Sequence, residues 1–305
     1  MPFTYQHITN INGVAELYST VKNFCENALG WTVKETGTSG TGKDYAIFYT
    51  AGESGQDNVY LGLTWYYVDD EKCGLQWNAY TGYSDTHGFC NLGAISCNVY
   101  NSAYRYLPTT VVQDTTLHAY LLGDKDCCIG VVRCVTLYPC FYVGLLRRYW
   151  SRQYDPLPLY LFGSLRNGYV PSDSKWNDDQ RLGGFSGWYN SSTRNYMWYS
   201  WDSWVYGFKL EWGSSGVRDG GSRVVLWPMA KGYGADLIDP SKYFVIPFII
   251  NDETGERGEM KWVYKLSRAH DLNPEDEVTV EDVTYKVFPS QTDLNLNRWY
   301  AIRWC

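Results

Sequence analysis

The sequence predicts a mostly β protein, sandwich-like and antiparallel, with a short N-terminal α-helix and a possible inserted β-subdomain. Strand-like runs and turn-forming segments alternate along most of the chain, which is typical of an all-β sandwich or barrel. Aromatic residues make up 17% of the 305 residues, with 28 Tyr and 14 Trp, and such side chains favour strands and large cores. Only one stretch has the periodicity of a helix.

That helix is predicted within residues 10–31, NINGVAELYSTVKNFCENALGW. Asn12 is a candidate N-cap, Glu16 falls in the first turn, and Gly30 lies just past the end. The apolar positions at helical spacing, which form the face expected to pack on the rest of the fold, are Val14, Leu17, Val21, Phe24 and Leu29.

Strands follow Gly30. In the first half of the chain they are WTVKET, YAIFYTA, NVYLGLTWYYV, LQWNAYTGY and residues 117–146, which contain two or three strands. In the last part they are YFVIPFII, MKWVYKLSRA, a hairpin-like pair VTVEDVTYKVF around Glu281 and Asp282, and RWYAIRW. No repeat of fixed period is present, so the sequence does not indicate a propeller or a solenoid.

We therefore divide the chain into four segments. Residues 1–30 form a helical segment that packs on the following domain, and residues 31–165 form a β domain. Residues 166–242 are a Trp- and Gly-rich insert or set of loops, and residues 243–305 are strands that complete the β domain. Long loops of this kind are usually functional or disordered, and the tryptophan content argues against disorder.

Charge and cysteine content restrict the classes of partner. The net charge is −7 and the pI about 5.2, which opposes a nucleic-acid-binding role for the whole chain. The first residues lack the pattern of a signal peptide, and no apolar run approaches a membrane span, so we expect no membrane insertion. The nine cysteines are expected to be reduced thiols that behave as small hydrophobic residues. Cys128, Cys134 and Cys140 share one face if they lie on a continuous strand, unless a turn interrupts it.

No catalytic or cofactor motif is recognised, so we expect no enzyme activity, no cofactor and no metal. GTSGTGKD (37–44) lacks the order of a phosphate-binding loop, because Asp44 follows Lys43. The acidic runs at 69–71, 178–179 and 275–277 lie in turn-like sequence, where acidic residues are expected on solvation grounds. The four histidines show no ligand spacing, and zinc would need four convergent ligands.

The segment 141–164, FYVGLLRRYWSRQYDPLPLYLFGS, is aromatic, cationic and interrupted by proline. Residues 141–146 are expected to be an interior strand, and residues 147–155 a turn whose arginines face solvent or a partner's carboxylates. A sugar, a nucleic acid or a plain turn are the alternatives to a protein partner. The candidate subunit interface consists of Arg147, Arg148, Trp150, Arg152 and Tyr154.

A second aromatic stretch, residues 188–212, leaves three interpretations open: packing within a core or loop, a subunit interface, or stacking on sugar rings. Aromatic side chains are common at protein–protein hot spots and in β cores, as well as in carbohydrate sites. The candidate glycan or partner surface consists of Trp188, Tyr189, Trp198, Trp201 and Trp204.

The order of these features resembles a family of structural proteins of tailed bacteriophages. The resemblance is carried by NFCENALGWTVKE, LQWNAYTGY, YVGLLRRYW with PLPLYLFGS, and the C-terminal run PFIINDETGERGEMKWVYKLSR through RWYAIRW. It covers about two thirds of the chain and carries over no active-site residues; the Trp-rich stretch from about 176 to 235 departs from the pattern.

The resemblance implies a virion component of the neck or collar, tail or baseplate, assembled in the bacterial host cytoplasm. Its partners would be copies of itself in a ring and other virion proteins. The alternative is a receptor-recognition or decoration module that binds a host surface glycan through residues 188–212.

Overall fold

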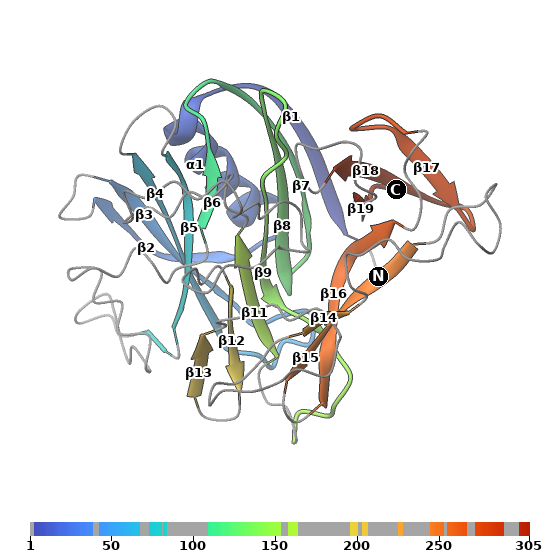
Figure 1. Ribbon diagram of the computed structural model, residues 1–305. Coiled ribbons are helices and arrows are strands. Elements are labelled where there is room, and N and C mark those ends of the chain that lie inside the picture. Colours follow the sequence, from blue (N-terminus) through green and yellow to red (C-terminus); the bar gives the residue numbers. More distant parts are fainter. Residues whose placement is uncertain are drawn as a thin grey trace.

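The computed structural model confirms a mostly β, antiparallel fold with a short N-terminal helix (Figure 1). It describes residues 3–38, 43–67, 73–80, 82–83, 109–153, 158–163, 196–200, 203–206, 225–227, 245–252, 255–266, 272–289 and 299–305. The strands of these segments form three sheets. Within the described residues, no helix is both long and apolar enough to cross a membrane.

The central sheet runs in the order β1-β7-β8-β9-β11-β12-β13. Its strands are β1 (Thr4–Asn12), β7 (Thr116–Gly123), β8 (Cys127–Cys134), β9 (Cys140–Leu145), β11 (Leu159–Gly163), β12 (Tyr196–Ser200) and β13 (Ser203–Tyr206). The expectation of strands within residues 117–146 is met by β7, β8 and β9, with tight connections between them.

A second sheet has the order β2-β3-β4-β5-β6 and covers one face of the central sheet. Its strands are β2 (Thr32–Thr38), β3 (Asp44–Thr50), β4 (Val59–Tyr67), β5 (Cys73–Tyr80) and β6 (Thr109–Val112). These strands follow one another in sequence and in space, so the sheet is a simple meander.

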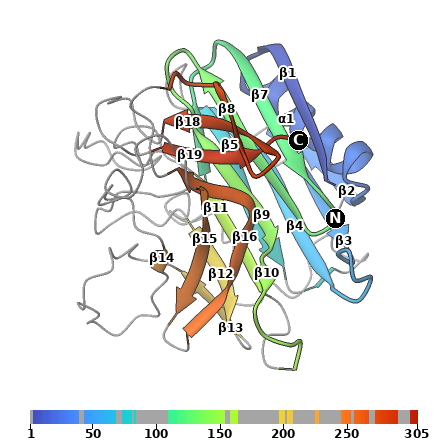
Figure 2. The same ribbon diagram turned by 90° about the vertical axis from the view of Figure 1, so that its right-hand side faces the viewer.

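The third sheet is built from the C-terminal part of the chain and lies on the opposite face of the central sheet (Figure 2). Its order is β14-β15-β16-β19-β18-β17, and β10 pairs with β16 at one side. The strands are β10 (Arg147–Arg148), β14 (Val225–Trp227), β15 (Val245–Asp252), β16 (Gly255–Leu266), β17 (Glu277–Val280), β18 (Val283–Pro289) and β19 (Trp299–Arg303).

Strands β8, β9 and β11 of the central sheet are buried on both faces, which explains why they read as continuous apolar runs rather than alternating ones. Along β9, Phe141 and Val143 belong to the core shared with the second sheet and the helix. Cys140 and Tyr142, the intervening residues, belong to the core shared with the third sheet. The period-2 alternation of a strand thus distributes one apolar sequence between two cores.

The helix α1 (Gly13–Asn23) continues into a π-helical turn, η1 (Phe24–Ala28), and its predicted apolar face is confirmed. The five expected positions are all buried in the core under the second sheet: Val14, Leu17, Val21, Phe24 and Leu29. Gly30 ends the helical segment with a φ of +70°, a conformation that glycine adopts without steric strain.

Asn12 occupies the expected N-cap position, but its side chain does not accept the capping hydrogen bond. Its backbone N–H donates to Glu16 Oε2 at 2.7 Å. Instead, Asp114, from the segment between β6 and β7, accepts a hydrogen bond from the Val14 N–H at 2.8 Å. A tertiary contact 100 residues away therefore replaces the local cap.

Four strands outside the insert were not predicted, namely β1, β6, β10 and β11. β1 precedes the helix and has mostly polar, exposed residues, so it gives little periodic signal. β10 is only two residues long and falls inside the predicted turn. The four-segment division of the chain stays a prediction, and most of the insert at 166–242 lies outside the described residues.

Candidate functional site

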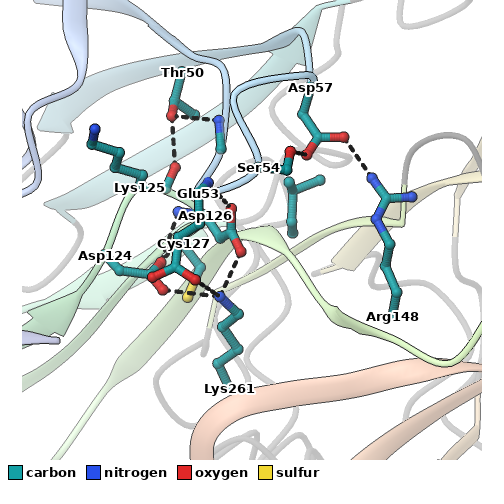
Figure 3. A network of polar contacts seen from close by, with 12 residues as sticks. Thr50, Glu53, Ser54, Asp57, Asp124, Lys125, Asp126, Cys127, Arg148 and Lys261 are labelled. Atoms are coloured by element: carbon teal, nitrogen blue, oxygen red, sulfur yellow. Dashed lines mark hydrogen bonds and ion pairs between the residues drawn. The ribbon is translucent and has the colours of Figure 1, made fainter. Parts of the chain in front are cut away.

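Charged side chains from all three sheets meet at one place (Figure 3). The loop between β3 and β4 supplies Glu53 and Asp57, and the turn between β7 and β8 supplies Asp124 and Asp126. Lys261 comes from β16. We call Glu53, Asp124, Asp126 and Lys261 the lysine cluster.

Lys261 lies at the centre of the lysine cluster. Its Nζ is 2.5 Å from Asp126 Oδ2 and 2.9 Å from Asp124 Oδ2, while Glu53 Oε2 is more distant at 3.7 Å. Lys261 and Asp124 are buried, although lysine and aspartate are rarely buried unless they are paired. The cluster therefore joins a strand of the third sheet to loops of the other two.

Backbone groups fix the carboxylates. Asp124 Oδ1 accepts hydrogen bonds from the N–H groups of Asp126 at 2.7 Å and Cys127 at 3.0 Å. Asp126 Oδ1 accepts a hydrogen bond from the Glu53 N–H at 2.7 Å. The Trp31 indole donates to the Asp124 carbonyl at 3.2 Å, so the turn is also held from the end of the helical segment.

Burial and neighbouring charges shift the proton affinities in the lysine cluster. Burial, followed by the charge of Asp124, raises the pKa of the Glu53 carboxyl. Burial alone lowers the pKa of Lys261, but Cys127, Asp124 and Asp126 outweigh it and raise that pKa overall. The cluster thus combines an amine and a carboxyl group that both have an increased affinity for a proton.

The three carboxylates place ligand oxygens within 4.8 Å of one another, a grouping that suits a hard cation. The ammonium of Lys261 already lies among them and supplies positive charge. An acidic group with its own lysine is explained without an ion, so the geometry does not favour a metal centre here.

The arginines of the candidate interface bind carboxylates of their own chain. Arg148 contacts Asp57 Oδ1 at 2.5 Å, and Arg152 contacts Asp57 Oδ2 at 2.7 Å. Arg147 pairs with Glu259, its strand partner on β16, and its side chain is 55% exposed. These arginines thus have carboxylate partners within the chain, Arg147 also faces solvent as expected, and contact with another protein stays a prediction.

Two aromatic residues of the same segment are exposed. Tyr149 is 42% exposed and Trp150 is 49% exposed, although large aromatic side chains are usually buried. Tyr154 lies outside the described residues. The role of this segment as a subunit interface stays a prediction. Tyr149 and Trp150, rather than the arginines, are now the residues that we expect to contact a partner.

The structure does not test the candidate glycan surface. Trp188, Tyr189 and Trp201 lie outside the described residues, and Trp198 and Trp204 are described only by their backbone. That backbone forms the hairpin of β12 and β13, in which Trp198 is opposite Val205 and Tyr199 is opposite Trp204. The glycan-binding interpretation stays a prediction.

The described cysteines are free thiols, and all of them except Cys305 are buried. Cys128 and Cys134 lie on β8 and face the same core, as their spacing indicates. Cys140 faces the other core, because residues 135–139 turn the chain into β9. Cys128 and Cys134 therefore share a face of the sheet, and Cys140 does not.

One acidic run is less solvated than the sequence indicates. The carboxylate of Glu275 accepts hydrogen bonds from Tyr120 at 2.7 Å, Tyr138 at 3.0 Å and Arg133 at 3.2 Å. It therefore fastens the turn before β17 to the central sheet. The explanation by solvation alone was wrong for this residue.

Sequence reasoning did not identify the lysine cluster or Asp57. Both acidic segments, ESGQD and GDKD, look like ordinary turns, and Lys261 looks like the polar position of a strand. The available signal was Lys261 itself, a lysine between aromatic and apolar residues in MKWVYKL. The sequence matches no protein-family model and no curated protein.

Proposed function

We propose that the protein is a structural subunit of a tailed-phage particle, in the neck or collar, tail or baseplate. It acts by assembly with copies of itself and with other virion proteins. The resemblance in the order of sequence features supports this proposal, and so does the arrangement of residues 147–152.

The observation that carries the proposal is the exposed pair Tyr149 and Trp150 between arginines that are held in place. Arg148 and Arg152 both bind Asp57, which is buried, and Arg147 binds Glu259. The loop is therefore ordered before any partner binds, which reduces the entropy lost on association. Aromatic side chains on an ordered support are typical of interface hot spots.

The lysine cluster also fits an assembly role. Its lysine is paired with carboxylates of the same chain, and the cluster connects the three sheets at one point. A rigid, multiply connected subunit transmits load without local unfolding. The net charge of −7 favours solubility of the subunit before assembly.

The test is to locate the protein in particles. Purified virions are cross-linked and digested, and peptides cross-linked to this chain are identified by mass spectrometry. The proposal expects cross-links between copies of the chain and to neck, tail or baseplate proteins, including cross-links near residues 147–152. A soluble monomer that is absent from purified particles would refute it.

A further inference from the structure

The lysine cluster brings an amine and a carboxyl group from different sheets into direct contact in a buried site. We infer that Lys261 and Asp124 become joined by an intramolecular isopeptide bond, with Glu53 and Asp126 as the groups that transfer protons. This inference concerns a covalent modification of the chain and does not depend on the proposed function.

The first support is the geometry of the two reacting groups. Lys261 Nζ lies 2.9 Å from Asp124 Oδ2, and the two side chains are only 7% and 5% exposed. A buried ion pair loses much of its solvation energy, whereas an amide in the same place carries no net charge. Burial therefore favours condensation over the separated ions, and it limits the access of water for the reverse reaction.

The second support is the environment of the Asp124 carboxyl group. Its Oδ1 accepts two backbone hydrogen bonds, from Asp126 and Cys127. Paired N–H donors of this kind stabilise the negative charge that develops on an oxygen when a nucleophile attacks its carbon. Asp126 is the weaker acceptor for the bond, because it is more exposed, at 15%, and one backbone N–H bonds its Oδ1.

The remaining two carboxyl groups are placed to transfer the protons. Asp126 Oδ2, 2.5 Å from Lys261 Nζ, is positioned to accept a proton from the ammonium and so release the nucleophilic amine. Burial and the charge of Asp124 raise the pKa of Glu53, which favours this carboxyl as the proton donor to the departing oxygen. One carboxylate thus acts as a base and the other carboxyl as an acid.

The step balances without an external reactant. The ammonium of Lys261 passes a proton to Asp126, and Glu53 protonates the Asp124 carboxyl. Nζ attacks Cγ of Asp124, a C–N bond forms, one C–O bond breaks, and the oxygen leaves as water. Asp126 gives its proton to the leaving oxygen, and the second proton of Nζ passes to Glu53. Both carboxyl groups thus return to their starting states, and one ammonium and one carboxylate give one amide and one water.

The bond would connect residues 137 positions apart, from the turn between β7 and β8 to β16. It would close a long loop and fasten the central sheet to the third sheet. A covalent link between sheets resists mechanical separation in a way that hydrogen bonds do not.

Intact-mass spectrometry of the full, denatured and reduced chain tests the inference. We expect a mass lower than that of the sequence by one water, and one cross-linked peptide pair in a digest that contains Lys261 and Asp124. A fragment spectrum that places the link at Asp126 would overturn the identity of the acceptor. A full-length chain at its unmodified mass, after prolonged incubation in the folded state, would overturn the inference itself.

Variants distinguish the isopeptide bond from other modifications that lower the mass by one water. Lys261→Arg and Glu53→Gln are expected to restore the unmodified mass, whereas Lys125→Arg, a change at an exposed lysine of the same turn, keeps the reduced mass. A succinimide at an aspartate also lacks one water, but it would persist in Lys261→Arg and would give no cross-linked peptide. If a variant fails to fold, the peptide map of the unaltered chain still decides.

Discussion

Lys261 reaches Asp124 across 137 residues of sequence and across the boundary between two sheets, with 2.9 Å between Nζ and Oδ2. Among the ion pairs of the lysine cluster in the described residues, this contact joins the two most deeply buried side chains. This pair therefore helps to hold the third sheet to the central one, and its chemistry is accessible to mutation.

Replacement of Lys261 by methionine is expected to destabilise the fold strongly. The change leaves the buried Asp124 without its cation, and breaking a buried pair typically costs about 3–5 kcal/mol. Denaturant unfolding followed by tryptophan fluorescence measures the loss. Lys125→Met is the matched control, because Lys125 is an exposed lysine between the same two aspartates. Equal stabilities of the two variants would contradict the role of Lys261.

Replacement of Asp57 by asparagine is expected to release the loop that carries Tyr149 and Trp150. Arg148 and Arg152 both lose a charged acceptor, and a hydrogen bond to a charged group contributes about 1.5–3 kcal/mol. Limited trypsin digestion should then cut faster after Arg148 and Arg152. Asp282→Asn, at an exposed turn position with φ of +63° that asparagine also tolerates, should leave the digestion rate unchanged.

Replacement of Tyr149 and Trp150 by serine is expected to prevent assembly while the monomer stays folded. Their exposure means that little of the core depends on them, and loss of an aromatic hot spot costs about 2 kcal/mol or more of binding free energy. Incorporation into particles is measured beside the circular dichroism of the free chain. Tyr67→Ser, at another exposed tyrosine, is the control. Normal particles from the double variant would exclude this surface from assembly.

Reversing the charges of Arg148 and Arg152 tests the interface less clearly than replacing Tyr149 and Trp150 by serine. Both side chains bind Asp57 within the same chain, so reversal would disorder the loop whether or not a partner contacts it. A failure to assemble would then have two explanations. The serine variants avoid this ambiguity.

Protonation of His7 is expected to lower stability. Burial lowers the pKa of His7 below 6.5; Lys286, His118 and Arg133 add to this effect, and Glu275 opposes it. A histidine whose pKa is lower in the folded state than in the unfolded state stabilises the fold at pH values above its unfolded-state pKa. This stabilisation is lost as the pH falls from 6.5 through the lower pKa of the folded state. The effect is modest, because His7 is largely exposed.

Unfolding at about pH 7.5 and about pH 5.5 measures the His7 effect, since the ordinary titration of histidine lies between these values. His7→Gln should reduce the difference in unfolding free energy between the two conditions. The same difference in the variant and the unaltered chain would show that the titration of His7 is not linked to folding.

Local patterns predicted the elements whose apolar residues follow one period. The helix face from Val14 to Leu29 is of this kind. The buried residues of β9 form a continuous apolar run instead, which also marks a strand from neighbouring residues alone. β1 was missed because its residues are mostly polar and exposed, so its pairing with β7 is set by backbone hydrogen bonds that leave no periodic pattern.

The site was missed for a different reason. Asp57, Asp124 and Lys261 acquire their roles only when the three sheets converge, because these residues are far apart in the sequence. Charged residues in turns are ordinarily solvated, so their burial cannot be inferred from the turn sequence itself. Tertiary topology decides which turns are covered.

The N-terminus of α1 gives the clearest comparison between local and tertiary effects. Asn12 is in the N-cap position, but its side chain makes no capping hydrogen bond, whereas Asp114 accepts one from the Val14 N–H at 2.8 Å. Asp114→Ala should therefore cost about 1 kcal/mol, the usual contribution of a cap, and Asn12→Ala should cost much less. Denaturant unfolding of the two variants gives both values, and the reverse order would show that the local side chain caps the helix in solution. Since Asp114 lies between β6 and β7, its loss should also loosen the contact between the helix and the two sheets that it packs against.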